Sequence, residues 1–486
     1  METRSFFGID FGTTNTSVVQ IIKEEGLGEK ETIYGEDGSE SFASMLAIID
    51  EKTINFGNEV KSNRDSLAEK CTVISSFKSL LGTGTEINIQ GKVLYPKDVT
   101  ALYLKCLKQY IKQTFDIDIK KASFSFPVGF SPEARRDLKF AAQKAGIEVS
   151  ALISESTAAY IAEHKNMTGF SRVMVVDWGG GTLDISILEI EHRCVFEKSV
   201  YGEKIGGDDI DKELAKAIHS QFGLKISDPT NRVNFDEMPA IQRDKIISAC
   251  ERAKISISED GETYPLTVRD YGAYGTKTIN ITNEFFEDIV KPIIKQKVLR
   301  TINSAMERAG VTKSGIDCVI IAGGSSNLRP FADAMKNLFG EDKIFIPNQV
   351  RSVSAKGAAC TPIIGGQFKL SDNIGIMMSD NTVFPILKRD VDGVNTISEK
   401  YTFSLVEDSP DAHIIITDGA GKTVYKKINV PTKGFLRERL EIQAHIDDAQ
   451  IATINIRSTC VSDVLKESKA EISQLTFYYD LKRLDA

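Results

Sequence analysis

The sequence of 486 residues has little cysteine and no long apolar run. Its seven cysteines are an odd number and form no C-x-x-C pair, which argues against a disulfide framework or a structural zinc site. No stretch approaches the ~20 apolar residues that a membrane helix needs. We therefore expect a protein of the reducing cytoplasm with no membrane partner.

Positive charge is also scarce. The sequence has 60 lysines and arginines against 68 aspartates and glutamates, for a net charge of −8. This acidic balance, without any long basic run, argues against nucleic acid as a partner. The start METRSFFGID reaches an aspartate before a secretory apolar segment could form, and the end KRLDA matches no retention or lipidation signal.

The length and a change of pattern along the chain predict two domains. A single core stops growing at roughly 250–300 residues. Strand and helix patterns alternate up to Gly366, which predicts an α/β domain at 1–366. After a predicted linker at 367–373, strand-like runs separated by turn signals predict an all-β sandwich at 374–486.

Local signals place some elements within these domains. Ser131 and Pro132 form a helix start and Gly146 a helix end, while an amphipathic pattern over 284–308 predicts a long helix before Gly310.

In the β-domain, Asp418 and Gly419 predict a hairpin turn. The alternating Ile414 and Ile416 fit a sandwich core better than a binding pocket.

Two segments repeat one plan. FFGIDFGTTNTSVV (residues 6–19) and VMVVDWGGGTLDISILEI (residues 173–190) each have an apolar strand, an aspartate, a bulky residue, glycine, small residues and a second strand. The repeat suggests two related halves with a site between them. Glycine-rich tips expose backbone N–H groups that suit phosphate oxygens. Asp10 and Asp177 would repel phosphate unless they hold hydrated Mg²⁺, so the pair predicts a clamp on the β- and γ-phosphates of a metal-bound nucleotide.

Two further glycine turns support this interpretation. CVIIAGGSSNLRPF (residues 318–331) is a buried strand followed by a glycine turn and a helix start, which would suit a nucleoside. KIGGDDID (residues 204–211) is another glycine turn before a helix and is weak by itself.

The segments GIDFGTTNTSV, VVDWGGGTLDISI, IGGDDID, ACERAK and IAGGSSNLRPF occur in this order. Together they resemble the phosphate, connecting and adenosine motifs of the heat-shock-70 chaperones, within the actin-like ATPase superfamily. The resemblance implies an actin-like ATPase domain of two lobes, built from duplicated ribonuclease-H-like halves and followed by a β-sandwich. It also implies ATP or ADP, Mg²⁺ and K⁺ as ligands.

The resemblance assigns roles to individual residues. The implied catalytic set is Lys78, which would position the attacking water, Glu155, which would assist that water, and Asp10, Asp177 and Thr182. Asp10 and Asp177 would hold the metal mostly through water. The implied nucleotide-binding residues are Gly12, Thr13, Thr14, Asn15, Gly179, Gly180, Gly181, Thr182, Asp184, Gly206, Gly207, Glu251, Lys254, Ser258, Gly323, Gly324, Ser325 and Asn327. Pro127, Arg135 and Glu155 match the family's interdomain switch.

Without the family, two of these assignments have simpler interpretations. Lys78 fits a solvated helix lysine, and Glu251 with Lys254 fits an ordinary helix pair three residues apart.

Several segments depart from the family's pattern. Ile255 and Asn327 stand where two arginines commonly sandwich the adenine, so we expect weaker adenine affinity or looser base selectivity. The segment NQVRSVSA replaces an acidic run, and the linker GGQFKLSDN replaces a leucine-rich one. The chain ends about where the family's helical lid would begin, so we expect a lidless site that releases clients quickly.

Three hypotheses follow. The favoured one is a monomeric ATPase chaperone whose nucleotide state controls binding of unfolded or extended polypeptide or of a partner protein, with a J-domain co-chaperone and a nucleotide-exchange factor. The second is a co-chaperone or scaffold that holds nucleotide with little hydrolysis. The third is another actin-like class, a small-molecule kinase or a filament former.

Overall fold

The computed structural model describes residues 3–24, 28–50, 53–68, 70–224, 233–261, 263–406, 409–432, 438–458 and 467–481. The chain divides into two compact units. Unit 1 comprises Met1–Phe130, Asp137–Ile190 and Lys198–Ile363, and unit 2 comprises Ser131–Arg136, Glu191–Glu197 and Ile364–Ala486. No helix among the described residues is long and apolar enough to cross a bilayer.

The first sheet of unit 1 has the strand order β11-β10-β1-β2-β3, with β4 also paired to β2. Its strands are β1 (Thr3–Phe11), β2 (Asn15–Glu24), β3 (Gly28–Tyr34), β4 (Phe42–Ala43), β10 (Lys121–Phe126) and β11 (Glu148–Ser154). Strand β1 is antiparallel to β2 and parallel to β10, which is parallel to β11. Apolar side chains such as Ile9, Val18 and Phe124 are fully buried in this sheet.

The second sheet of unit 1 repeats this arrangement in the order β18-β17-β12-β13-β14. Its strands are β12 (Arg172–Trp178), β13 (Leu183–Glu191), β14 (Cys194–Glu203), β17 (Cys318–Ala322) and β18 (Ile344–Phe345). Strand β12 is antiparallel to β13 and parallel to β17, which is parallel to β18. In the two central hairpins Asp10 lies opposite Ser17, and Asp177 lies opposite Asp184. The duplication predicted from the two motifs is therefore confirmed.

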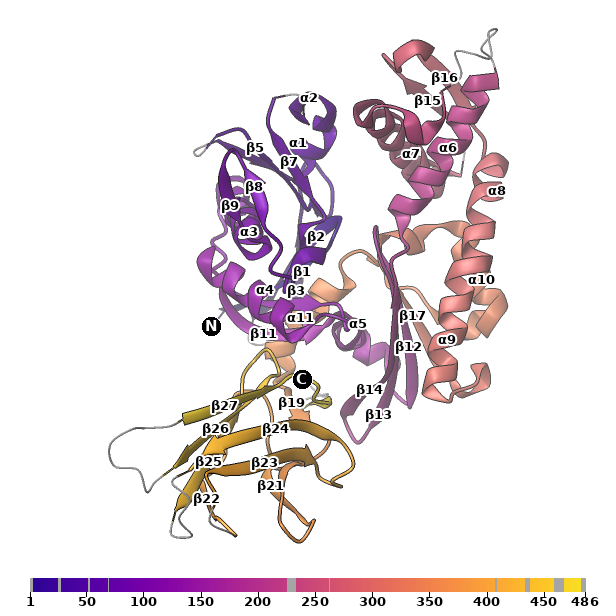
Figure 1. Ribbon diagram of the computed structural model, residues 1–486. Helices are drawn as coiled ribbons and strands as arrows, with labels where there is room; N and C mark the ends of the chain where they lie inside the picture. Colours follow the sequence, from indigo (N-terminus) through magenta and orange to yellow (C-terminus); the bar gives the residue numbers. More distant parts are fainter. Residues whose placement is uncertain are drawn as a thin grey trace. The chain divides into compact units, whose positions relative to one another are not determined.

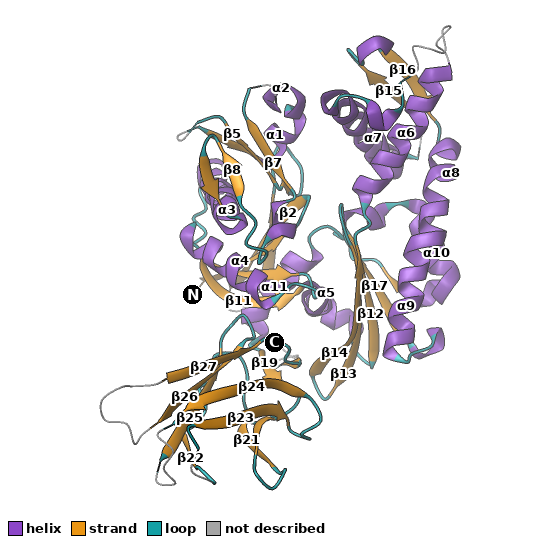
Figure 2. Cartoon of the chain, in the orientation of Figure 1, coloured by secondary structure: helices purple, strands orange, loops and turns teal. Residues whose placement is uncertain are grey.

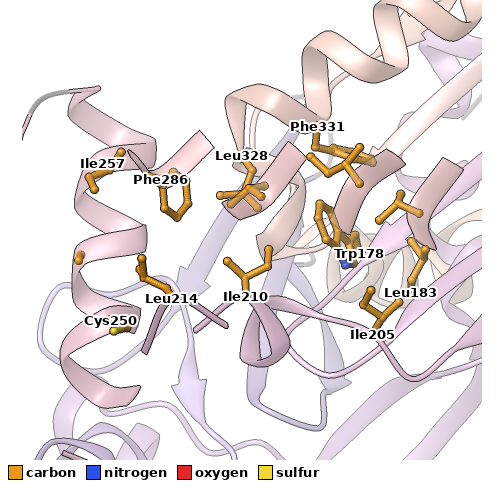
Figure 3. Packing of buried hydrophobic residues seen from close by; sticks show 14 of the residues in the cluster. Trp178, Leu183, Ile205, Ile210, Leu214, Cys250, Ile257, Phe286, Leu328 and Phe331 are labelled. Atoms are coloured by element: carbon orange, nitrogen blue, oxygen red, sulfur yellow. The ribbon is translucent and has the colours of Figure 1, made fainter. Parts of the chain in front are cut away.

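Helices cover both faces of the second sheet. Helix α5 (Glu155–Glu163) contacts β12 and β17, while α9 (Leu299–Ala309) and α10 (Arg329–Phe339) lie on the opposite side (Figure 1). A buried cluster fills the space between the sheet and the helices on this opposite side. Figure 3 shows the indole of Trp178 against Phe331, with Ile210 and Leu328 close by, and the two ring centroids are 5.0 Å apart. The large side chains of this core therefore hold the second hairpin in place.

The signals for helix ends are confirmed in α4 (Pro132–Lys144). The Ser131 hydroxyl accepts a hydrogen bond from the Ala134 N–H at 3.1 Å, and Gly146 after the helix has a φ of +76°. The serine hydroxyl satisfies a free N–H of the first helical turn, and the glycine in the left-handed region ends the helix.

The predicted long helix before Gly310 is confirmed, with one difference. It is α8 (Asn283–Ile293), a π-helical turn over Ile294–Val298 and then α9, which ends at Gly310 in the left-handed region. Pro292 has no N–H for the α-helical ladder, and its ring crowds the preceding turn. The wider π-turn that follows accommodates the missing hydrogen bond and the crowded ring. The apolar periodicity of the sequence could not indicate this π-turn.

The remaining parts of unit 1 extend from the two sheets. The first extension holds β5 (Met45–Ile48), β6 (Ile54–Phe56), α1 (Gly57–Ser62), α2 (Arg64–Ala68), β7 (Thr72–Ser75), β8 (Ile87–Ile89), β9 (Lys92–Leu94) and α3 (Pro96–Phe115). The second holds α6 (Gly207–Leu224), α7 (Ala240–Asp260), β15 (Tyr264–Val268) and β16 (Lys277–Ile281). Helix α11 (Val353–Ile364) follows β18.

Unit 2 contains two four-stranded sheets, β21-β20-β23-β24 and β22-β25-β26-β27, drawn as orange arrows in Figure 2. Their strands are β20 (Ile374–Met377), β21 (Val383–Leu387), β22 (Tyr401–Ser404), β23 (Asp411–Asp418), β24 (Val424–Pro431), β25 (Arg439–Ile446), β26 (Ala452–Ser458) and β27 (Glu467–Ile472). The hairpin around Asp418 is confirmed, and Ile414 and Ile416 belong to the buried core. The described residues from 365 onward include no helix.

Two short strands of unit 2 do not belong to its two four-stranded sheets. Strand β19 (Gln367–Leu370) pairs antiparallel with β28 (Phe477–Asp480). Part of the predicted linker is therefore an ordered strand, while the boundaries at 366 and 373 stay predictions. The six cysteines within the described residues are unpaired, and Cys460 lies outside the described residues.

Candidate functional site

Tight contacts hold the two hairpin tips close together in unit 1. A Cβ on Gly12 would lie 2.1 Å from the Asn15 carbonyl oxygen, and a Cβ on Gly180 would lie 2.4 Å from Thr14 Oγ1. The first tip is anchored by Ser44, whose hydroxyl donates to the Gly12 carbonyl at 2.7 Å. Glycine is required at these two positions because a side chain on Gly12 would distort the first tip and one on Gly180 would push the two tips apart.

Hydrogen bonds to the carbonyl groups fix the second tip. The Gly179 carbonyl accepts from Gly207 N at 3.1 Å and from Ser325 Oγ at 2.8 Å, and the Gly180 carbonyl accepts from Asp208 N at 2.8 Å. The N–H side of this loop is then the side that can receive an anion. Gly206 supports the loop from behind, since a Cβ there would lie 2.1 Å from the Gly180 carbonyl oxygen.

Three carboxylates converge behind the tips. Burial, together with the charges of Asp10 and Asp184, raises the pKa of Asp177 from 3.8 to about 8 against the opposing effect of Lys78. Burial also raises the pKa of Asp184. Asp10 accepts a hydrogen bond from Ser125 Oγ at 2.8 Å. Acids crowded in this way need a cation to ionise together, so they fit a hydrated Mg²⁺.

The acids do not form a direct ligand set. Among the described residues, no three aspartate, glutamate, histidine or cysteine side chains are close enough to hold one ion. Binding of Mg²⁺ by Asp10 and Asp177 through water agrees with this spacing and stays a prediction.

Lys78 lies on a short 3₁₀ turn, Phe77–Leu80, entered through Ser76 at a φ of 57°. Its Nζ is 3.0 Å from Glu155 Oε1, at the start of α5, and the two side chains are 4% and 10% exposed. The interpretation of Lys78 as a solvated helix lysine is therefore wrong.

Burial and charge act oppositely on this pair. Burial lowers the pKa of Lys78, but the charges of Glu155 and Asp10 outweigh it, so the lysine pKa is raised and the ammonium is retained. Burial raises the pKa of Glu155 well above its usual value, and Asp10 and Asp177 raise it further against the effect of Lys78. A fixed cation beside a buried carboxyl of raised pKa is suited to acid–base work at a phosphate.

The other end of the site is formed by α7. Glu251 pairs with Lys61 at 2.6 Å, and Lys254 pairs with Asp211 at 2.6 Å. Glu251 and Lys254 are thus not the simple helix pair that their spacing allows. The Lys254 ammonium also donates to the Gly207 carbonyl at 3.0 Å. The backbone carbonyl of Lys254 accepts from the Ser258 hydroxyl at 2.6 Å.

A cavity of about 260 Å³ brings most of the predicted residues together. Its lining includes all five predicted catalytic residues and every predicted nucleotide-binding residue except Asp184 and Gly206. Asp184 lies beneath the tip, opposite Asp177, and Gly206 supports the second loop. Pro127 of the switch segment also lines the cavity.

Some lining residues were missed by the sequence analysis. They are Ser17, Ser39, Ser41, Asn58, Lys61, Asp208, Glu259, Leu328, Val350, Arg351 and Ser354, with Ile255 noted only as a departure. Asp208 follows Gly207 directly and could have been found from the glycine turn. Thr14 donates to it at 3.3 Å, across the two halves. Lys61 comes from a distant segment that no local motif marks, and Arg351 lies in NQVRSVSA, which was noted only as a departure from the family's pattern.

The chain matches one family model, described as Hsp70 protein, over residues 82–423. The matched range includes the second hairpin, Glu155, the glycine turn of α6, the α7 residues and the Gly323 turn. Asp10 and Lys78 lie before it.

Proposed function

Because the chain belongs to the Hsp70 family, we propose that it binds Mg-ATP in the cavity of unit 1 and hydrolyses it slowly. Family membership makes it an ATP-binding, chaperone-like protein with the two-lobed actin-like ATPase fold. In the proposal, the nucleotide state sets the affinity of unit 2 for extended polypeptide or for a partner protein. A J-domain co-chaperone and a nucleotide-exchange factor are the proposed helpers of a monomeric cycle.

The phosphate-binding role rests on the two glycine tips. The N–H groups at Gly12–Thr14 and Gly180–Thr182 would hold the β- and γ-phosphates. Bound Mg²⁺ would neutralise phosphate charge there. Asp10 and Asp177 would hold its water shell, and the same acids would accept K⁺ nearby.

The hydrolytic role rests on Lys78 and Glu155. The Lys78 ammonium would stabilise the charge that develops on the γ-phosphate and would hold the attacking water in line. Glu155, 3.0 Å away, would orient the same water. Thr182, at the second tip, would contribute its hydroxyl to the γ-phosphate.

One observation carries the proposal. The buried Lys78–Glu155 pair lines the same cavity as Asp10, Asp177 and the two glycine tips. A buried ion pair contributes little to stability by itself, so its place beside a phosphate cradle supports a chemical role.

Single-turnover hydrolysis of labelled ATP with Mg²⁺ and K⁺ tests the proposal, with and without an unfolded peptide. We expect slow hydrolysis that the peptide accelerates. Tight retention of unhydrolysed ATP would favour the scaffold hypothesis. Absence of ATP binding would overturn the proposal.

A further inference from the structure

Among the described residues, four basic side chains line the cavity: Lys61, Lys78, Lys254 and Arg351. The three lysines each pair with a carboxylate within 3.0 Å, and each of these partners is largely buried. Arg351 differs, since its Nη2 is 3.9 Å from Glu259 Oε1 and the two side chains are 37% and 61% exposed. The Arg351–Glu259 pair is therefore loose enough to rearrange around a ligand.

The backbone of Arg351 is nevertheless held by a hydrogen bond. Its carbonyl accepts from the Ser17 hydroxyl at 3.0 Å. A Cβ on Gly324 would lie 3.6 Å from Arg351 Nε and 3.7 Å from its Cγ, so the arginine stem lies along the glycine turn after β17. The guanidinium end of the side chain lies at the cavity, where it meets Glu259 only loosely.

This end of the cavity is where a base would lie. The phosphate tips are at the Asp177 end, which the Gly323 turn closes, since a Cβ on Gly323 would lie 2.5 Å from Asp177 Oδ1. The polar groups of Glu251 and Lys254 come next, on α7. One helical turn farther on, Glu259 faces the cavity together with Leu328 and Arg351.

The walls and edges of this end differ in chemistry. Ile255 is 36% exposed and offers an apolar face to a ring. The edge groups are the guanidinium of Arg351, which only donates hydrogen bonds, and the carboxylate of Glu259, which only accepts them when ionised.

Guanine matches these edges. Its O6 and N7 both accept, as a bidentate arginine requires, and its N1–H and 2-amino group donate, as a carboxylate requires. Adenine has an amino donor between N7 and N1, so arginine reaches one acceptor at most and the carboxylate faces the acceptor N1.

We propose that Arg351 and Glu259 read the edge of the base and that the cavity binds guanine nucleotides at least as tightly as adenine nucleotides. This inference rests on the proposed function, because it concerns the base of the nucleotide in the same cavity. Arg351 supplies the contacts to O6 and N7, and Glu259 supplies those to N1–H and the 2-amino group.

Equilibrium binding of Mg-ATP, Mg-GTP and Mg-ITP to the full chain tests the inference. We expect GTP to bind at least as tightly as ATP. Arg351→Ala should weaken GTP binding by about tenfold or more and ATP binding much less. Arg351→Lys should not restore GTP affinity, because an ammonium cannot make the bidentate contact. Glu259→Gln should weaken GTP more than ITP, which has no 2-amino group.

Arg64→Ala is the matched control. Arg64 pairs with Asp244 at 3.4 Å with similar exposure, and it does not line the cavity. It should leave all three affinities unchanged, and thermal melts should show every variant folded.

Tighter binding of ATP than GTP by tenfold or more, or an equal loss of both in Arg351→Ala, would overturn the inference and leave the proposed function standing. Absence of binding by either nucleotide would overturn both.

Discussion

The two ends of the cavity differ in how deeply their side chains are buried and how firmly they are held. At the end with the glycine tips, Lys78 and Glu155 are buried, and their contact at 3.0 Å fixes their positions. At the base end, Ile255 is partly exposed, and Arg351 and Glu259 meet only loosely. Interactions between charges are strong where water is excluded and the groups are held in place. Interactions between solvent-exposed charges are weak, and the side chains that make them rearrange easily. The proposed phosphate site is thus built more rigidly than the proposed base site.

The largest expected effect comes from the rigid end. Lys78→Ala should slow single-turnover hydrolysis by about 100-fold or more, because it removes a positioned charge from the reacting phosphate. Nucleotide affinity should change much less, since the glycine tips remain.

Lys112→Ala serves as its control, because Lys112 pairs with Asp116 on the surface of α3. If Lys78→Ala hydrolyses ATP at the wild-type rate, the catalytic assignment is wrong.

Gly180 and Gly181 offer a matched pair of neighbours. Gly180→Ala puts a methyl group 2.4 Å from Thr14 Oγ1, whereas the nearest atom to a methyl on Gly181 is 3.7 Å away. We expect Gly180→Ala to weaken ATP binding by about tenfold or more through displacement of the two tips, and Gly181→Ala to do so much less. Calorimetric titration of both variants measures the difference. Equal losses would show that the contact between the tips does not matter for binding.

At the loose end, Ile255→Arg should strengthen binding. A guanidinium over the face of the base adds roughly 0.5–2 kcal/mol, or up to about 30-fold in affinity. Stacking does not read the base edge, so ATP and GTP should gain alike. A gain confined to one nucleotide would indicate an edge contact instead.

The smallest expected effect is on thermal stability and concerns a buried carboxyl, Glu36, that needs no ligand for its test. Burial raises the pKa of Glu36 from 4.5 to about 7, the Asn58 N–H lowers it, and Asp37 raises it. The favourable contribution of this protonated acid is complete below pH 4.5 and is lost as the pH rises through 7. Glu36→Gln should therefore raise the melting temperature at pH 8 relative to wild type, by roughly 2–4 °C, and less at pH 5. The same gain at both pH values would show that the carboxyl titrates normally.

Local chemistry explains which parts of the site the sequence could predict. The hairpins of Asp10 and Asp177 and the caps of α4 depend on neighbours within a few residues, so a short segment contains their whole signal. Pairs made over long sequence distances contain none. Lys61 reaches Glu251 across 190 positions, and only the fold buries Lys78 against Glu155.

The base end was predicted only as a departure from a family pattern. Ile255, Asn327 and the segment NQVRSVSA could be seen as replacements, but nothing in that segment marks Arg351 as a lining residue. Its place depends on the glycine turn at Gly324, which belongs to another strand. A side chain that reaches a site from elsewhere in the fold becomes visible only when the fold is known.

The chain's one tryptophan has a spectroscopic consequence. The backbone of Trp178 continues into the second phosphate tip, but its indole is fully buried against Phe331 on the far side of the sheet. Its emission should lie at short wavelength and resist quenching by iodide or acrylamide. Unfolding of the surrounding core should shift it to the red, so this single residue provides an intrinsic optical probe for denaturation of the second half of unit 1.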